Sequence, residues 1–345
     1  MKKALSIAVC TLLAAVTFSG CYTGGPVNTT TTISAKGDVK TGLGVVTSIA
    51  GSASAADGQD GKGEAVFTAA AVLVDENGTI LSCDLDVLDA TINFSAAGAI
   101  TSDLTAALST KNELGDNYGM KQYSPIQKEW DEQADAFCTF STGKTLNDVA
   151  AIALDEGGKT TDADLAAGCT MGITDFIKAV SEAVDNATAR GASAGDRIYL
   201  GISATPSSSK DSADGADGTV SVAATFMAVS ANSEGVFTSA YADGVEALIN
   251  FNATGAVTSD LSTQFVSKYD LKEDYGMKQY SPIQKEWYEQ ADGLCGFMVG
   301  RTMEQVSSAV SDGYASDADL AATCTINMFA FLDAAAKAAS QFPTV

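Results

Sequence analysis

The sequence predicts an α+β fold in which two tandem homologous domains each pack an antiparallel meander sheet with about three helices. Two observations predict it: the 345-residue chain repeats itself at a nearly constant shift, and each copy places strand-type patterns before helix-type patterns. A hydrophobic content of 46% is sufficient for packed cores. We expect the repeat domains to span 41–190 and 195–342.

Two repeated motifs define the duplication. The thirteen residues YGMKQYSPIQKEW occur at 118–130 and again at 275–287, a shift of 157. The segment DADLAAGCT at 162–170 matches DADLAATCT at 317–325 at a shift of 155. The second copy has therefore lost two residues between the motifs.

The N-terminus has the pattern of a secretory signal. Residues 1–20 place two lysines before an apolar run, and Phe18–Cys21 resembles the bacterial lipobox, in which the cysteine receives lipid after cleavage. The Gly-, Thr- and Ser-rich segment 21–40 predicts a flexible tether. We expect a protein anchored to the lipid bilayer through Cys21, on the extracellular face of the cell membrane; the alternative is ordinary secretion.

Strands are expected at the start of each copy. Short apolar runs at Leu43–Ile49 and Tyr199–Ile202 predict the opening strands. Apolar runs on both sides of Asp75–Gly78 predict a hairpin, since Asn-Gly accommodates positive φ in a tight turn. A further strand pair is expected around Ser95–Gly98 and around the equivalent Asn252–Gly255.

Helices are expected in the second part of each copy. The first begins at Ser124, an N-cap residue followed by proline, and runs toward Phe140. A short second helix begins at Thr145, and Asp148 completes its N-terminal cap. Apolar residues at helical spacing predict a third helix over Asp164–Asn186.

Composition excludes several classes of function. The chain has no histidine, which excludes Ser-His-Asp and Cys-His relays and histidine-ligated zinc. Its 20 Lys and Arg against 43 Asp and Glu give a net charge of -23, without the basic cluster that nucleic acid requires. No metal site and no catalytic residue are predicted. An acidic hydrolase with paired carboxylates is the least favoured class, because no separate cleft is indicated.

The first motif has two interpretations. It is a capped helix start that places Trp130 in the core, or it supplies flat aromatic surfaces for a planar ligand. In the second interpretation the ligand-facing residues are Tyr118 and Tyr123, with Tyr275 and Tyr280 in the second copy.

The second motif, by its pattern alone, indicates the first turn of a helix. In that interpretation Thr161 and Asp164 form a capping pair, as do Ser316 and Asp319.

The same segment resembles the D-x-x-[ST]-[GS]-A-T motif of FMN-binding domains, in which a transferase attaches FMN to the final threonine through a phosphodiester. The chain has alanine in place of the motif's hydroxyl residue and cysteine in place of its alanine. The resemblance implies one covalent FMN per repeat, on Thr170 and Thr325, with Asp164 and Asp319 as the acidic motif residues. A helix N-terminus nearby suits the phosphate.

The resemblance extends over nearly the whole mature chain, from the lipobox to the last motif. It is to tandem flavin-carrying surface lipoproteins of extracellular electron transfer, including the pheromone-precursor type. It implies a monomeric electron carrier, rather than an enzyme with turnover of its own, whose partners are a flavin transferase and a membrane electron donor. The alternative is a cofactor-free surface binding or adhesion lipoprotein built from two copies of one module.

Two cysteines recur in each repeat. Cys138 corresponds to Cys295, and Cys169 corresponds to Cys324. The simplest interpretation is one disulfide per repeat, Cys138–Cys169 and Cys295–Cys324. The alternative is buried free thiols that pack as small hydrophobic groups.

Overall fold

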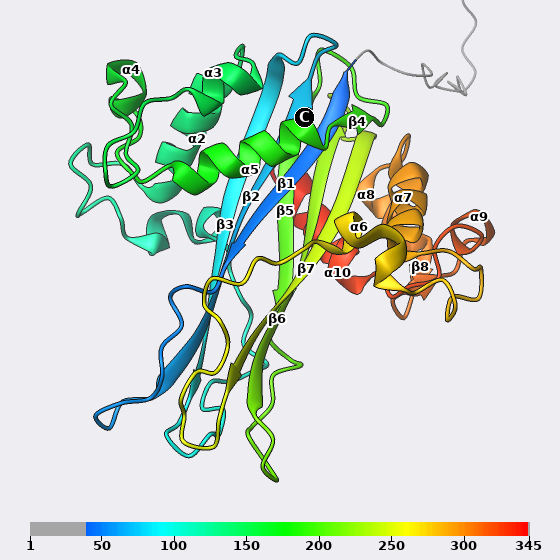
Figure 1. Ribbon diagram of the computed structural model, residues 1–345. Helices are drawn as coiled ribbons and strands as arrows, with labels where there is room; N and C mark the ends of the chain where they lie inside the picture. The colour runs from blue at the N-terminus through cyan, green and yellow to red at the C-terminus, as the bar shows by residue number, and fades with distance from the viewer. Residues whose placement is uncertain (1–38, 344–345) are drawn as a thin grey trace, which may run out of the picture. The chain divides into compact units, whose positions relative to one another are not determined.

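A computed structural model describes residues 39–343 (Figure 1). The predicted signal peptide, Cys21 and nearly all of the predicted tether lie outside these residues. In the first half, the sheet has the order β3-β2-β1-β4; its first three strands precede the helices in the chain and the short β4 follows them. The elements are β1 (Lys40–Ser48), β2 (Gly61–Val74), β3 (Ile80–Phe94), α1 (Lys111–Leu114), the 3-10 helix η1 (Gly115–Tyr118), α2 (Trp130–Ser141), α3 (Leu146–Ala150), α4 (Ala163–Ala166), α5 (Thr174–Asp185) and β4 (Thr188–Ala189).

The second half repeats this order with the sheet β5-β6-β7. Its elements are β5 (Arg197–Thr205), β6 (Gly218–Ala231), β7 (Phe237–Phe251), α6 (Lys268–Leu271), η2 (Lys272–Tyr275), α7 (Trp287–Met298), α8 (Met303–Ser308), the small hairpin β8 (Val310–Ser311) and β9 (Tyr314–Ala315), α9 (Ala318–Ala321) and α10 (Phe329–Ala339). The α+β class is confirmed, with antiparallel pairing in each sheet.

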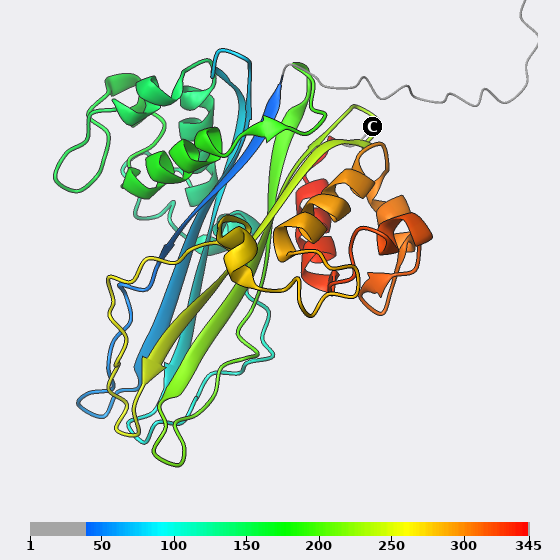
Figure 2. The same ribbon diagram turned by 45° about the vertical axis from the view of Figure 1, so that its right-hand side comes forward.

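The two sheets pack face to face, and helices cover their outer faces. Figure 2 shows the helices of the first half on one side of the strands and those of the second half on the other. Three hydrophobic clusters fill the spaces between these layers, one between the sheets and one under each group of helices. The described residues therefore form a four-layer helix–sheet–sheet–helix arrangement.

Strand β2 shows why its sequence is an almost continuous apolar run. Side chains alternate between the faces of a strand. Phe67 and Leu73 face the other sheet, whereas Val72 and Val74 face the helices. Because both faces are buried, no polar alternation is required.

Direct contacts join the two halves. The rings of Phe94 and Phe251 stack with their centroids 4.0 Å apart, and the hydroxyls of Thr41 and Ser239 share a hydrogen bond of 2.6 Å. Since the halves share one core and form one compact unit, the expected division into separate domains at 41–190 and 195–342 stays a prediction.

Several local predictions are confirmed. The opening strands, the hairpin at Asp75–Gly78 and the short helix capped by Thr145 and Asp148 are present. Gly78 has a φ of 79°, the left-handed conformation expected of glycine in this turn.

The predicted start of the first helix at Ser124 is wrong. The helix α2 begins at Trp130, where Glu129 and Glu132 form the capping box. Between Ser124 and the helix, Gln127 has a φ of 53°, which interrupts helical geometry. Ser124 instead lies in a turn.

The single helix predicted over Asp164–Asn186 is also wrong. The segment instead contains two helices, α4 and α5, with a loop between them. The predicted capping pairs are displaced by one residue. The carboxylates of Asp162 and Asp317 accept hydrogen bonds from the N–H groups of the second and third residues of α4 and α9. After Ser95–Gly98 and Asn252–Gly255 the chain makes single bridges instead of strand pairs.

Candidate functional site

Each half contains a pocket between its sheet and its helices. The first pocket has a volume of about 650 Å³ and the second pocket about 470 Å³. The first pocket is lined mainly by Thr68, Lys111, Tyr118, Met120, Trp130 and Phe176. The residues at the equivalent positions, Thr225, Lys268, Tyr275, Met277, Trp287 and Phe331, line the second pocket. The duplication has therefore preserved a pocket as well as a core.

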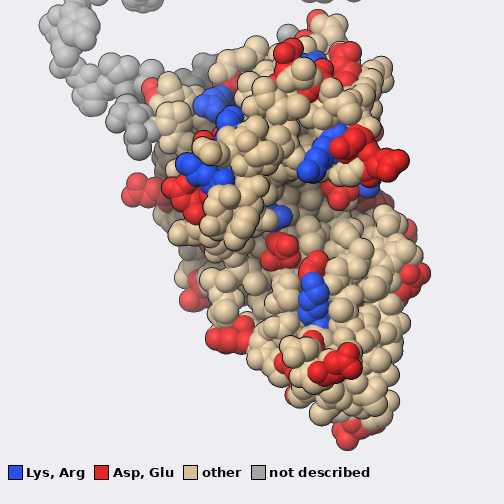
Figure 3. All heavy atoms as spheres, turned by 90° about the vertical axis from the view of Figure 1, so that its left-hand side faces the viewer, with Lys and Arg blue, Asp and Glu red and all other residues tan. Residues whose placement is uncertain are grey.

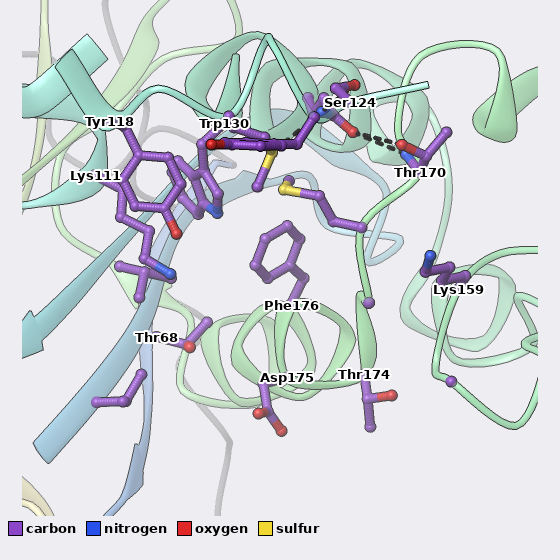
Figure 4. Close-up of a pocket in the computed structure, with 18 of the residues that line it drawn as sticks. Thr68, Lys111, Tyr118, Ser124, Trp130, Lys159, Thr170, Thr174, Asp175 and Phe176 are labelled. Atoms are coloured by element: carbon purple, nitrogen blue, oxygen red, sulfur yellow. Dashed lines mark hydrogen bonds between the residues drawn. The ribbon is translucent and has the colours of Figure 1, made fainter. Parts of the chain in front are cut away.

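Figure 4 shows how the side chains surround the first pocket. Lys111 and Tyr118 lie on one side, Thr170 and Lys159 on the other, and Phe176 between them. The ring of Phe176 meets Trp130 edge-on, with centroids 5.8 Å apart. The wall thus combines aromatic rings with aliphatic and methionine side chains, and polar groups lie at its two ends.

A buried carboxylate shapes the loop of the first motif. Glu129, only 4% exposed, accepts hydrogen bonds from the backbone N–H groups of Met120 and Lys121 at 2.8 and 3.0 Å. Glu286 makes the same two bonds in the second half. The recurrence of KEW in both copies is explained by this contact, because the glutamate both caps the helix and holds the loop that enters the pocket.

A buried glutamine joins the two motifs. The Oε1 of Gln133 accepts from the N–H and the hydroxyl of Thr170 at 2.9 and 3.1 Å. Its Nε2 donates to the hydroxyl of Ser124 and to the carbonyl of Lys128. In the second half Gln290 binds Thr325 in the same way, at 2.8 and 3.0 Å.

Four of the eight predicted cofactor-site residues line one of the two pockets. Thr170 is half-buried and lines the first pocket, as does Tyr118. Tyr123 also lines it but is 83% exposed. In the second half Tyr275 lines the pocket, and half-buried Thr325 precedes two residues that line it.

Other predicted residues lie away from the pockets. Tyr280 is 81% exposed and does not line the second pocket. Asp164 and Asp319 are exposed, and each carboxylate is on a short helix beside its pocket rather than in its wall.

The lysine in each pocket was not predicted from the sequence. The Nζ of Lys111 lies 5.3 Å from the ring centroid of Tyr118 and 5.6 Å from that of Trp130. The Nζ of Lys268 lies in the same way near the rings of Tyr275 and Trp287. Burial lowers the pKa of Lys268. Identity at the shift of 157, which found the first motif, also holds for these lysines and for Gln133, and was the available signal.

The predicted disulfides do not form in the structure, where all five described cysteines are free. The nearest sulfur to Cys138 is that of Cys83, at 3.0 Å, because α2 packs this cysteine against β3. Cys169 follows α4 and is buried in the core under the helices. Burial raises the pKa of Cys295 to about 12 and that of Cys324 to about 11.

Basic and acidic side chains are interspersed over the face shown in Figure 3, which includes helices of the first half. No cluster of three or more metal-binding side chains occurs within residues 39–343. In the same part of the chain, none of the helices combines the length and apolarity needed to cross a bilayer.

Comparison with models of known protein families, with curated proteins and with solved structures gives no match for this chain.

Proposed function

We propose that the protein is a surface electron carrier with one FMN bound covalently in each half, on Thr170 and Thr325. In this proposal Cys21 anchors the chain to the lipid bilayer, a flavin transferase loads it and a membrane donor supplies its electrons. The observation that carries the proposal is that Thr170 lines a pocket built twice from equivalent residues, while Thr325 directly precedes two residues that line the second pocket.

The residues present fit a flavin. Ligand pockets typically have volumes of about 300–1,000 Å³, apolar walls and a few placed polar groups. The first pocket meets each condition, with Trp130 and Phe176 in the wall and Lys111 facing the aromatic rings. Aromatic faces suit a planar ring system, and a cation suits the electron-rich edge of a flavin or its phosphate.

FMN supplies hydride and single-electron chemistry when bound. The chain's own residues position and shield it. Gln133 fixes the backbone of Thr170, and Glu129 holds the loop that carries Met120 into the pocket. Trp130, only 3% exposed, forms a buried apolar part of the pocket wall that excludes water. None of these roles requires a histidine.

The test is to express the chain with a flavin transferase and to measure flavin fluorescence that survives denaturing electrophoresis. We expect Thr170→Val and Thr325→Val each to remove about half of the signal, and the double variant to remove all of it. Thr174→Val is the matched control, since Thr174 lines the same pocket outside the motif. A double variant as fluorescent as the parent contradicts the proposal.

One observation favours a second function, that of a cofactor-free binding or adhesion module. Tyr123 and Tyr280 occupy equivalent positions and are 83% and 81% exposed, so the protein presents the same aromatic side chain twice. Paired sites increase avidity through their linkage. A parent protein that stays colourless with an active transferase favours this function over the first.

A further inference from the structure

Two thiols in the first half lie close enough to be linked. The Sγ atoms of Cys83 on β3 and Cys138 on α2 are 3.0 Å apart, although 55 positions separate them in the sequence. We propose that Cys83 and Cys138 form a disulfide when the protein meets an oxidant of the small-molecule disulfide class, such as oxidised glutathione. This inference is independent of the proposed flavin.

The surroundings of the pair allow an oxidant to enter. Cys83 is half-buried, whereas Cys138 is only 6% exposed. Both line a surface cavity of about 420 Å³ whose wall also carries Asp135, Thr139 and Arg197. A polar cavity of this size admits a small peptide disulfide to Cys83.

The difference in exposure between the two thiols determines the order in which they react. The thiolate of Cys83 attacks one sulfur of the oxidant, releases one thiol and forms a mixed disulfide. Cys138 then loses its proton, attacks the sulfur of Cys83 and releases the second thiol. The protein loses two electrons and two protons, and the oxidant becomes two thiols. The contact with Cys83 and burial raise the pKa of the Cys138 thiol. Because Cys83 is also the more exposed of the two, it is the first nucleophile.

The second half provides a matched comparison. Position 240 corresponds to Cys83 at the shift of 157, and it holds alanine. Ala240 and Cys295 are both buried in the core under the helices of that half. The second half therefore has no thiol opposite Cys295 at this position, and Cys295 serves as an internal control.

The test treats the full chain with oxidised glutathione, blocks the remaining thiols with an alkylating agent and maps the peptides by mass spectrometry. We expect a Cys83–Cys138 cross-link that reductant removes, with Cys169, Cys295 and Cys324 alkylated after denaturation. Cys83→Ser should leave Cys138 fully alkylated, as Cys295, which has Ala240 opposite it, is in the parent protein. A Cys138–Cys169 cross-link, or an alkylated Cys83 and Cys138 after oxidation of folded protein, overturns the proposal.

Discussion

Gln133 holds Thr170 by two hydrogen bonds to a single oxygen, one from the backbone N–H at 2.9 Å and one from the hydroxyl at 3.1 Å. The same relation recurs between Gln290 and Thr325. Because the glutamine is fully buried, it connects the helix of the first motif with the loop of the second through an environment that excludes water. The two segments that the duplication preserved are thus parts of one site.

The glutamine is a positioning residue, and its replacement should act on one half only. Gln133→Leu leaves the N–H of half-buried Thr170 without its acceptor, so we expect a loss of about 1–3 kcal/mol in the free energy of unfolding. We also expect flavin on Thr170 to decrease while flavin on Thr325 is unchanged.

Gln290→Leu is the reciprocal control and should reverse the pattern. Quantitative peptide mapping of the two threonines measures both effects. Equal loss of flavin from both halves in either variant contradicts a local positioning role.

Lys111 should affect the redox potential of the first site. A positive charge facing the pocket stabilises the electrons that a bound flavin accepts. Loss of about 1 kcal/mol of electrostatic stabilisation of the reduced flavin changes the redox potential of a two-electron couple by ~20 mV. Lys111→Gln should therefore make the potential of the first site more negative by roughly this amount, as measured by spectroelectrochemistry in a Thr325→Val background. Lys121→Gln is the control, since that lysine is exposed outside the first pocket. A positive shift on Lys111→Gln contradicts the assignment.

Buried carboxylates should make the protein less stable at neutral pH than in weak acid. Burial raises the pKa of Asp86 to about 7, and it raises those of Asp84 and Asp243 to about 6. Unfolded aspartate has a pKa near 3.9, so between about pH 4 and 7 the folded state retains protons that the unfolded state has lost. The free energy of unfolding should therefore decrease as pH rises through this range. For each such carboxyl group the decrease is about 1.4 kcal/mol per pH unit between its unfolded and folded pKa.

Asp86→Asn keeps the oxygen that accepts from the N–H groups of Val87 and Asn112 and removes the titration. Urea unfolding from pH 4 to pH 8 should show a smaller slope in this variant than in the parent. Parallel curves for the two proteins are incompatible with a raised pKa at Asp86.

Glycines at the contact between strand and helix should be intolerant of a side chain. A Cβ on Gly44 would overlap the carbonyl oxygen of Ala179 on α5, and one on Gly201 would overlap that of Ala334 on α10. We expect Gly44→Ala and Gly201→Ala each to destabilise the protein by about 1–3 kcal/mol in thermal or urea unfolding. Gly296→Ala is the control: this exposed helical glycine has open space around it, and the change should stabilise by about 0.5–1 kcal/mol.

The sequence predicted what depends on local patterns. Alternating and continuous apolar runs located the strands, and the Asn-Gly turn located a hairpin. The shared core between the sheets was not predictable, because nothing in β2 distinguishes the face with Phe67 from the face with Val72. Which apolar face meets the other half depends on contacts between distant segments.

The candidate site was predictable only in part, because it also depends on contacts between distant segments. The repeat identified both motifs and their threonines, but it assigned Ser124 as a helix cap because Ser-Pro has that local preference. The buried Glu129 has two bonds to the loop that determine the real start, and these exist only in the folded protein. Lys111 lies outside the first motif; it recurs at the shift of 157, but its place in the pocket wall depends on the fold.

The most direct test of the central claim is to map the flavin on the chain. The protein is expressed with a flavin transferase, digested and analysed by tandem mass spectrometry. The account predicts that the peptides containing Thr170 and Thr325 each carry FMN joined through its phosphate to the threonine oxygen. Peptides free of flavin, or flavin attached to another residue while both threonines are unmodified, would contradict it.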